Sequence, residues 1–307
     1  MAAKQKPKAI KLIAIDIDGT LLNSDLQLST RNEETLKRVT AQGIHVILAT
    51  GKSRVAGEDL IKRLNITSPG IYLQGLCTYD SDGGVMRQQT LDPAIARQAI
   101  TFAEDRDFVV IAYSSSRILV RKHDDRILEG TVRYHESMPD AIGPLQNIVG
   151  ELPLNKLLLI GEPARIKALR WQLNAQLGGA CRLMQAGVPD MLEVLPPGAS
   201  KGHALKLLIN DMGIAPEHVM ALGDAENDIE MIELAGIGVA MGQASQHVKD
   251  SADYVTGTND EDGVAQAVDR FVLKTEADKP RSEDGAGPRA SKPEASAAET
   301  KAEESKT

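Results

Sequence analysis

Apolar runs rich in β-branched residues alternate with segments of helical periodicity at both ends of this chain, and that alternation restricts the fold more than any other feature. Near the N-terminus the apolar run 11–17 is followed by helical periodicity over 30–41 and by a second apolar run over 44–49. The helix is opened by Thr30–Glu33, which fits a capping box. Toward the C-terminus a helical segment over 201–212 precedes the apolar run 219–222. Alternation of this kind is typical of parallel sheets, in which each helix crosses back to the next strand. We therefore predict an α/β fold with a parallel-sheet core. Further elements of this core are predicted over 54–64, 70–73, 229–235, 237–240, 254–255 and 263–272.

Residues 84–189 follow a different rhythm. Helical periodicity over 93–105 precedes two adjacent strand-like runs, over 108–113 and 117–121, and the order recurs with a helix over 165–177 and strand-like runs over 181–185 and 191–195. Paired strands that follow a helix predict an antiparallel sheet with one covered face. We therefore predict a discontinuous Rossmann-like catalytic core over 9–83 and 190–273, interrupted by an inserted α+β cap domain over 84–189.

The composition changes abruptly after Leu273. Residues 274–307 include no Leu, Ile, Val, Met or aromatic residue, and charges of both signs alternate with Pro, Ser, Gly and Ala. Such a segment cannot bury enough apolar surface to offset the entropy of ordering. We predict a disordered tail, whose partner the sequence does not identify.

Charge and composition narrow the classes of partner. The formal net charge of −8 and the nine aromatic residues, one Trp, five Tyr and three Phe, argue against a nucleic-acid surface, which needs clustered Lys and Arg. No stretch approaches the roughly 20 apolar residues that span a bilayer. The two cysteines, Cys77 and Cys181, are far apart and lack metal-ligand spacing, which favours a reduced chain. We expect a cytoplasmic protein with no nucleic-acid or membrane partner.

The strongest motif is Asp16–Thr20, with the sequence Asp-Ile-Asp-Gly-Thr, directly after the first apolar run. Two carboxylates two residues apart then lie at the carboxyl edge of a parallel strand, where open α/β sheets bind ligands. Burying Asp16 costs free energy unless a cation or hydrogen-bond donors compensate for it. An Asp-Gly turn with solvated acids is the structural alternative, but the whole string after a strand favours a functional site.

Two further motifs follow strands in the same way. Thr50–Ser53 offers a hydroxyl, a glycine backbone and a helix start, which suit a phosphate, although plain N-capping by Ser53 explains it as well. Asp224 closes the run 219–222, and Asn227 and Asp228 come three and four positions later. Asp224, Asn227 and Asp228 are candidate metal ligands that all offer oxygen atoms, so this group favours Mg²⁺ over Zn²⁺.

Lys201 begins a predicted helix, where its charge opposes the helix dipole, and a nearby anion would explain this placement. Together the motifs supply a carboxylate nucleophile, a second carboxylate for proton transfer, a site for Mg²⁺, a lysine and a hydroxyl. That combination matches phosphoryl transfer through an aspartyl-phosphate.

In this order the motifs resemble those of the haloacid dehalogenase superfamily of phosphatases, specifically its Cof-type branch of sugar phosphatases. The resemblance covers nearly all of residues 9–273. It implies a Rossmann-like core and a mobile α+β cap inserted after the third core strand, in agreement with the boundaries predicted above.

The resemblance also implies roles for individual residues. Asp16 would attack phosphorus, and Asp18 would protonate the leaving oxygen and then activate water. Mg²⁺ would be held by the carboxylates of Asp16 and Asp224 and by the backbone carbonyl of Asp18, with Asp228 in the outer shell. The phosphate would contact the Ile17 backbone, Thr50, Gly51, Lys201 and Asn227.

Three positions depart from the pattern of this branch. Lys52 stands where Arg is usual, Gln74 precedes Gly75 where Asn-Gly is usual, and Gln243 stands where Asn is typical. A lysine offers a point charge where the planar fork of arginine would bind two oxygens. No catalytic group is lost, but the substrate preference of relatives cannot be transferred closely.

We therefore expect a Mg²⁺-dependent phosphatase that hydrolyses a small phosphorylated metabolite, such as a sugar phosphate or a related phosphate monoester, beneath a closing cap. Two alternatives stay open: a phosphotransferase or phosphomutase, and a non-catalytic regulator that binds a phosphorylated metabolite. The predicted cap has no motif that identifies the substrate. Candidate contacts, for which surface or packing roles are more usual, are Tyr113, Arg121, Arg133, Tyr134 and Asp190.

Overall fold

The computed structural model describes residues 9–133, 136–185 and 189–273, and the chain up to Leu273 forms one compact unit. The predicted tail over 274–307 lies outside the described residues. The core contains a five-stranded sheet in which every neighbouring pair of strands is parallel, as predicted. Its strands are, in spatial order, β14 (Tyr254–Val255), β13 (Ile237–Ala240), β12 (Val219–Gly223), β1 (Leu12–Ile15) and β2 (His45–Leu48).

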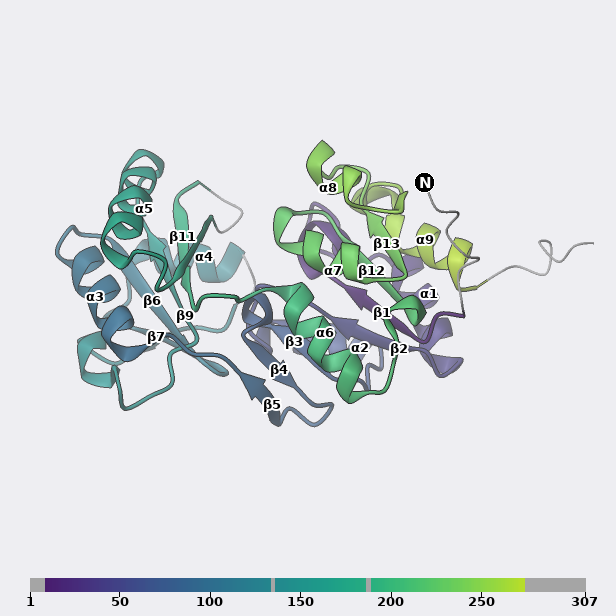
Figure 1. Cartoon of the computed structure of the whole chain (residues 1–307), viewed down its shortest axis with the longest axis horizontal. Coiled ribbons are helices and arrows are strands. Elements are labelled where there is room, and N and C mark those ends of the chain that lie inside the picture. Colours follow the sequence, from purple (N-terminus) through teal and green to yellow (C-terminus); the bar gives the residue numbers. More distant parts are fainter. Residues whose placement is uncertain (1–8, 134–135, 186–188, 274–307) are drawn as a thin grey trace, which may run out of the picture. The chain divides into compact units, whose positions relative to one another are not determined.

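Helices cover both faces of this sheet (Figure 1). Alternate strand residues point to opposite faces. Ile13 and Ile15 therefore pack in one cluster with three helices, whereas Leu12 and Ala14 pack in another with two. The first face is covered by α1 (Thr30–Ala41), α2 (Glu58–Arg63) and α9 (Gly263–Phe271). The second face is covered by α6 (Lys201–Asp211) and α7 (Ile229–Leu234), and the short α8 (Gln246–Asp250) packs beside β13.

A second, six-stranded sheet forms the body of the predicted cap. All of its strand pairs are antiparallel except β7 with β8. Its strands are, in spatial order, β10 (Arg182–Gln185), β11 (Met191–Leu195), β9 (Lys156–Ile160), β6 (Val109–Ser114), β7 (Arg117–Val120) and β8 (Asp140–Ala141). One face packs on α3 (Pro93–Glu104) and α5 (Pro163–Leu177), and α4 (Asp125–Arg133) lies on the other side (Figure 1). The antiparallel pairing and the face covered by α3 and α5 are what the repeated helix–strand–strand order predicts, whereas α4 on the opposite face was not predicted.

A small antiparallel sheet, which was not predicted from the sequence, connects the core sheet to the cap sheet. It consists of β3 (Gly70–Tyr72), β4 (Cys77–Tyr79) and β5 (Val85–Gln88). The run at 70–73, expected as a third core strand, reaches the parallel sheet only through one bridge between Ala49 and Ile71.

The strand pairing also bears on where the cap begins and ends. β5 pairs with β4, outside the six-stranded sheet, whereas β11 lies inside that sheet although residue 190 was the predicted start of the returning core. We propose that the inserted domain runs from about residue 91 to Leu195.

The start of α1 differs in detail from the prediction. The N-cap is Ser29, whose side chain accepts the backbone N–H of Asn32, and not Thr30. Glu33, expected to close a capping box, pairs with Lys37 and Arg63. The two ion pairs compete successfully for the Glu33 carboxylate, while the serine hydroxyl satisfies the helix terminus.

Candidate active site

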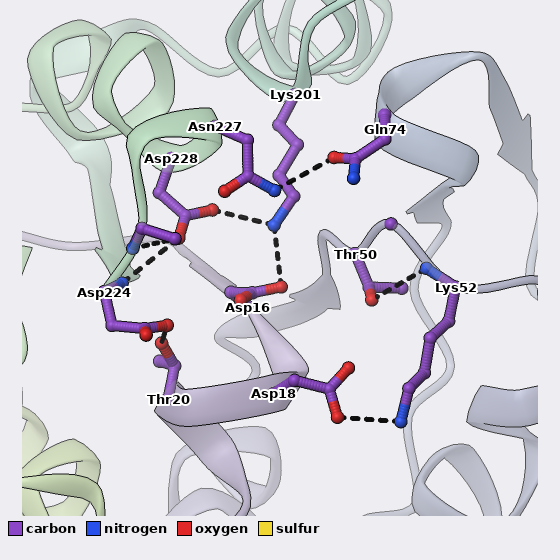
Figure 2. Close-up of polar contacts among 12 residues, drawn as sticks. Asp16, Asp18, Thr20, Thr50, Lys52, Gln74, Lys201, Asp224, Asn227 and Asp228 are labelled. Carbon is purple, nitrogen blue, oxygen red and sulfur yellow. Dashed lines mark hydrogen bonds and ion pairs between the residues drawn. The ribbon is translucent and has the colours of Figure 1, made fainter. Parts of the chain in front are cut away.

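Three neighbouring strands deliver the predicted motifs to one edge of the parallel sheet. β1 lies between β2 and β12, so the residues that follow these strands meet: Asp16, Thr50 and Asp224 (Figure 2). The carboxyl ends of parallel strands are where open α/β sheets form ligand sites. The insertion that separates Asp224 from the other two residues in sequence therefore does not separate them in space.

Lys201 lies at the centre of the acidic residues. Its ammonium donates to Asp16 Oδ1 and to Asp228 Oδ1, both at 2.7 Å, and its side chain is only 1% exposed (Figure 2). Lys201 is the first residue of α6, where a positive charge is disfavoured by the helix dipole. The carboxylates of Asp16 and Asp228 are nearby anions of the kind expected from the position of Lys201 at the helix start. Burial lowers the pKa of Lys201, but the two carboxylates raise it further, so that its pKa is higher than usual.

Asp224 and Asp228 are held by the loop that follows β12. Asp228 Oδ2 accepts the backbone N–H groups of Asp224 and Ala225, each at 3.1 Å. Asp224 Oδ1 accepts the hydroxyl of Thr20 at 2.9 Å. At Gly19, with a φ of 74°, a Cβ atom would collide with the Asp224 carboxylate, so this turn needs glycine.

The acidic groups outnumber the buried positive charge. Carboxylate oxygens of Asp16, Asp224 and Asp228 all lie within 4.8 Å of one another, and Lys201 is the ammonium bound between two of them. Burial raises the pKa of Asp224 to about 6, with Asp228 adding to the shift. Burial also raises the pKa of Asp16 well above its usual value, although Lys201 opposes this effect. An oxygen-only group with excess negative charge fits a hard divalent cation.

Asp18 has a different environment from Asp16. Its side chain is 37% exposed, and its Oδ1 lies 2.7 Å from the ammonium of Lys52, which is itself 9% exposed (Figure 2). Asp16, by comparison, is 8% exposed. The two carboxylates of the motif are thus distinguished by burial and by partner, since one binds Lys201 and the other binds Lys52.

The loop after β2 meets the loop after β3. Thr50 Oγ1 accepts the backbone N–H of Lys52 at 3.1 Å, and a Cβ atom at Gly51 would collide with the amide of Gln74. Gln74 Oε1 accepts an N–H of Asn227 at 2.9 Å (Figure 2). Gln74, which stands where asparagine is usual, therefore contacts two of the predicted phosphate-binding residues, Gly51 and Asn227. Gln243, the third departure, donates to the carbonyl of Gly19.

A buried ion pair of the cap sheet, between Lys156 on β9 and Glu193 on β11, is absent from the sequence-based candidates. Each side chain is 4% exposed. Lys156 also donates to the carbonyl of Gly51 at 3.0 Å, and Glu193 accepts from Gln74 at 3.1 Å. Single charges inside the apolar runs 156–160 and 191–195 were the available signal, the same kind of signal that marked Asp16.

A cavity of about 1230 Å³ opens over these groups, between the core loops and the cap sheet. Asp16, Asp18 and Asp224 line it, together with Tyr113 of the cap candidates. Arg121 pairs with Glu104, and Asp190 is not among the residues that line this cavity. Tyr134 and the Arg133 side chain lie outside the described residues.

Within the described ranges, the helices are too short or too polar to cross a membrane.

Comparison with known proteins shows extensive similarity. A family model described as haloacid dehalogenase-like hydrolase matches residues 13–268. "Endoribonuclease YBEY, chloroplastic" of Arabidopsis thaliana is 34% identical over 87% of this chain, which spans only 47% of that protein. "5-amino-6-(5-phospho-D-ribitylamino)uracil phosphatase YcsE" of Bacillus subtilis is 31% identical over 89% of this chain and 100% of its own length.

The solved structures agree with the sequence comparisons. The crystal structure of a haloacid dehalogenase-like hydrolase from Bacteroides thetaiotaomicron superimposes with a TM-score of 0.80 at 31% identity. It covers 85% of this chain and 99% of its own. The family resemblance drawn from the sequence motifs and the predicted fold class are both confirmed.

Proposed function

Because the chain belongs to the haloacid dehalogenase-like hydrolase family, we propose that it is a Mg²⁺-dependent phosphatase that hydrolyses a small phosphorylated metabolite through an aspartyl-phosphate. One observation supports this most directly. Asp16 is held by Lys201 at 2.7 Å beside Asp224, at the floor of a cavity that also receives Asp18. A positioned carboxylate beside excess negative charge suits nucleophilic attack on phosphorus when a cation is bound.

Asp16 acts as the nucleophile in this proposal. Lys201 holds Oδ1 of Asp16 and leaves the second oxygen to bond to phosphorus. As this bond forms, the bond between phosphorus and the leaving alcohol breaks, and an aspartyl-phosphate results. Hydrolysis then breaks the bond between Asp16 and phosphorus, so the carboxylate is regenerated and inorganic phosphate leaves.

Asp18 moves the proton in both steps. It protonates the leaving oxygen in the first step and takes a proton from water in the second. Its exposure to the cavity allows it to reach the leaving group, and Lys52 at 2.7 Å fixes its orientation. Positioned proton transfer of this kind contributes about 10²–10⁴-fold to a reaction rate.

The remaining residues bind metal and phosphate. Asp16, Asp224 and the backbone carbonyl of Asp18 would hold Mg²⁺, which supplies positive charge against the phosphate oxygens. Asp228 supports this site from outside, because both of its carboxylate oxygens already accept bonds from the protein. The phosphate would be contacted by the Ile17 backbone, Thr50, Gly51, Lys201 and Asn227.

The substrate is a small molecule in this account. The Bacillus relative is named for a phosphorylated ribitylaminouracil, and the cavity between core and cap is large enough for a molecule of that class. A cap that closes over it would exclude bulk water. The predicted cytoplasmic location stays a prediction.

The test is phosphate release from a panel of sugar, nucleotide and heteroaromatic phosphates, measured with Mg²⁺ and with EDTA. We expect release that needs Mg²⁺ and is lost in Asp16→Asn, which keeps the shape of the side chain but removes its nucleophilic charge. Asp25→Asn removes an exposed carboxylate outside the site and serves as the matched control, with activity unchanged.

Other outcomes distinguish the alternatives. Exchange of phosphate between two hydroxyl groups without net release would indicate a phosphomutase. Binding of the panel compounds without turnover in either assay would favour the non-catalytic regulator and would contradict the proposed function.

A further inference from the structure

The cap sheet presents an apolar face toward the cavity. Side chains alternate between the two faces of a strand. On β6 and β9, one set packs in a cluster with α3 and α5, and the other set, which includes Ile111 and Leu158, packs in a separate cluster without those helices. The register places Ile111 opposite Leu158, Tyr113 opposite Ile118, and Ile160 opposite Met191.

These six residues form a continuous surface, which we call the cap wall: Ile111, Tyr113, Ile118, Leu158, Ile160 and Met191. All of them line the same cavity as Asp16 and Asp18. Each is at most 9% exposed. Burial raises the pKa of Tyr113 well above its usual value, with Glu136 adding to the shift, so this phenol is uncharged at neutral pH. The wall therefore carries no formal charge.

The ionic groups on the same sheet face are already bound within the protein. Lys156 is engaged by Glu193 and by the carbonyl of Gly51, and its ammonium lies 4.6 Å from the centre of the Tyr113 ring. Glu193 also accepts from Gln74. These groups sit between the wall and the core loops, and they offer little hydrogen-bonding capacity to a substrate.

Other polar residues of the lining are similarly engaged. Glu136 accepts the backbone N–H and the hydroxyl of Ser53, at 3.0 and 2.6 Å. Arg182 donates to the carbonyl of Ala199, and Glu230 accepts from Ser200. Gln185, an exposed lining residue on β10, donates to the carbonyl of Met191 at 2.6 Å. The lining also includes the exposed polar residues Arg170, Glu226 and His247.

A surface of this kind discriminates between leaving groups. A hexose placed against the wall would lose the water bound to its hydroxyl groups without gaining protein partners, and unsatisfied polar groups are costly. A flat ring would instead bury apolar area against aliphatic side chains. Because wall residues on neighbouring strands lie directly opposite one another, they offer adjacent apolar side chains on which the face of a ring can rest.

We propose that the cap wall selects a phosphate monoester whose leaving alcohol carries an aromatic or heteroaromatic ring, in preference to a plain sugar phosphate. This inference rests on the proposed function, since it assigns the substrate class of the same site. It makes Ile111, Ile118, Leu158, Ile160 and Met191 specificity-determining residues.

The test compares benzyl phosphate with glucose 6-phosphate, both esters of primary alcohols. We expect kcat/KM to be at least about tenfold higher for benzyl phosphate, the size of effect that apolar pockets achieve. In Leu158→Asn this advantage is expected to fall about tenfold through loss of activity toward benzyl phosphate. Leu158→Met, which keeps the wall apolar, retains the preference.

A second variant tests the same inference if the first does not fold. If Leu158→Asn does not fold, as judged by its thermal transition, Ile118→Thr on β7, two strands away from β9, is measured in the same way. If the wild-type protein hydrolysed glucose 6-phosphate with a kcat/KM equal to that for benzyl phosphate, the inference would be overturned. The proposed phosphatase activity would still stand.

Failure of the proposed function gives a different result. If neither ester releases phosphate, binding of benzylphosphonate and of the phosphonate analogue of glucose 6-phosphate is measured by calorimetry with Mg²⁺. Tighter binding of benzylphosphonate supports the cap wall as a ring-binding surface, while catalysis is refuted. Equal or weaker binding of benzylphosphonate overturns the inference.

Discussion

The charge balance of the site depends on one residue, Lys201. Its ammonium joins Asp16 to Asp228 in surroundings almost closed to water. Removing one partner of a buried charge group leaves the others uncompensated, at a cost of about 3–5 kcal/mol. We predict that Lys201→Met lowers the free energy of unfolding by about that amount, measured by urea titration in EDTA.

A lysine on the exposed side of the same helix provides the control for this variant. Lys206→Met is expected to leave stability unchanged. If the two variants were equally stable, the ammonium of Lys201 would not be compensating the carboxylates, and the proposed electrostatic organisation would be wrong.

Lys52 has a different effect, which depends on the leaving group. Because its ammonium binds Asp18 at 2.7 Å, we expect Lys52→Ala to misplace the carboxylate that protonates the leaving oxygen. For an alkyl phosphate kcat should fall about 10²-fold, within the range for positioned proton transfer. For p-nitrophenyl phosphate, whose leaving group departs without a proton, the first step should be much less affected.

Single-turnover release of p-nitrophenol and of the alkyl alcohol measures this difference. Lys52→Arg preserves the positive charge and should restore most of the loss. Equal losses with both leaving groups would show that Lys52 binds the phosphate itself, and the positioning role would be abandoned.

If Asp224 holds Mg²⁺ as proposed, we expect metal binding to depend on pH. Its pKa is raised from 3.8 to about 6, so without metal the folded state holds this proton more tightly than the unfolded chain. Folding stability without Mg²⁺ is therefore lost as pH rises from about 4 to 6, and a cation that pairs with the carboxylate restores it. We predict that Mg²⁺ raises Tm more at about pH 7.5 than at about pH 5.

Asp224→Asn is the corresponding variant for the pH experiment. An amide carries no charge, so both the Mg²⁺ shift and its pH dependence should shrink. A Mg²⁺-induced rise in Tm of the same size at the two pH values would contradict the assignment of Asp224 as a ligand.

At the scale of elements, the ion pair between β9 and β11 connects the cap sheet to two core loops. Lys156→Met would leave Glu193 buried and unpaired, and we predict a loss of about 3–5 kcal/mol in the free energy of unfolding. The double variant Lys156→Met with Glu193→Met should recover most of this loss, since apolar replacements of a buried pair are often neutral. A double variant as unstable as the single one would refute the explanation.

The elements also show how far sequence reasoning extends. The helix at Thr30–Ala41 and the strands at Met191–Leu195 and Ile237–Ala240 were predicted with their observed bounds, because periodicity and burial agree there. Met191–Leu195 was predicted as one of two paired strands that follow a helix, but the predicted boundary at residue 190 assigned it to the core, whereas it pairs within the cap sheet. Strand pairing is a long-range property, and an apolar run fits either sheet.

At the site, the motif residues Asp16, Asp224 and Lys201 were found from the sequence because each follows a strand or begins a helix. Their mutual distances required the fold. Lys156 and Glu193 were missed, since each is a single charge within a strand and only the pairing of β9 with β11 reveals them as partners. Thr20 belonged to the predicted motif but had no predicted role, because its bond to Asp224 joins positions 204 residues apart.

At the scale of the whole compact unit, core and cap line one cavity, and we propose that each contributes a different part of the site. In the proposed mechanism, the core loops supply the groups that act on phosphorus, which are Asp16, Asp18 and Lys201, and the cap sheet supplies the wall that faces the leaving group. All of these residues line the cavity. On this proposal, variation in the wall would change substrate preference without disturbing the reacting groups, whose positions depend on β1 and α6.

The central claim is that Asp16 becomes phosphorylated during turnover. The most direct measurement uses Asp18→Asn, in which activation of water is slowed, with p-nitrophenyl phosphate, which needs no protonation to react. After acid quenching in a single turnover, mass spectrometry of peptides should find phosphate on Asp16. Release of p-nitrophenol without phosphate on any peptide that contains Asp16 would contradict the account, because phosphorus would then have passed directly to water.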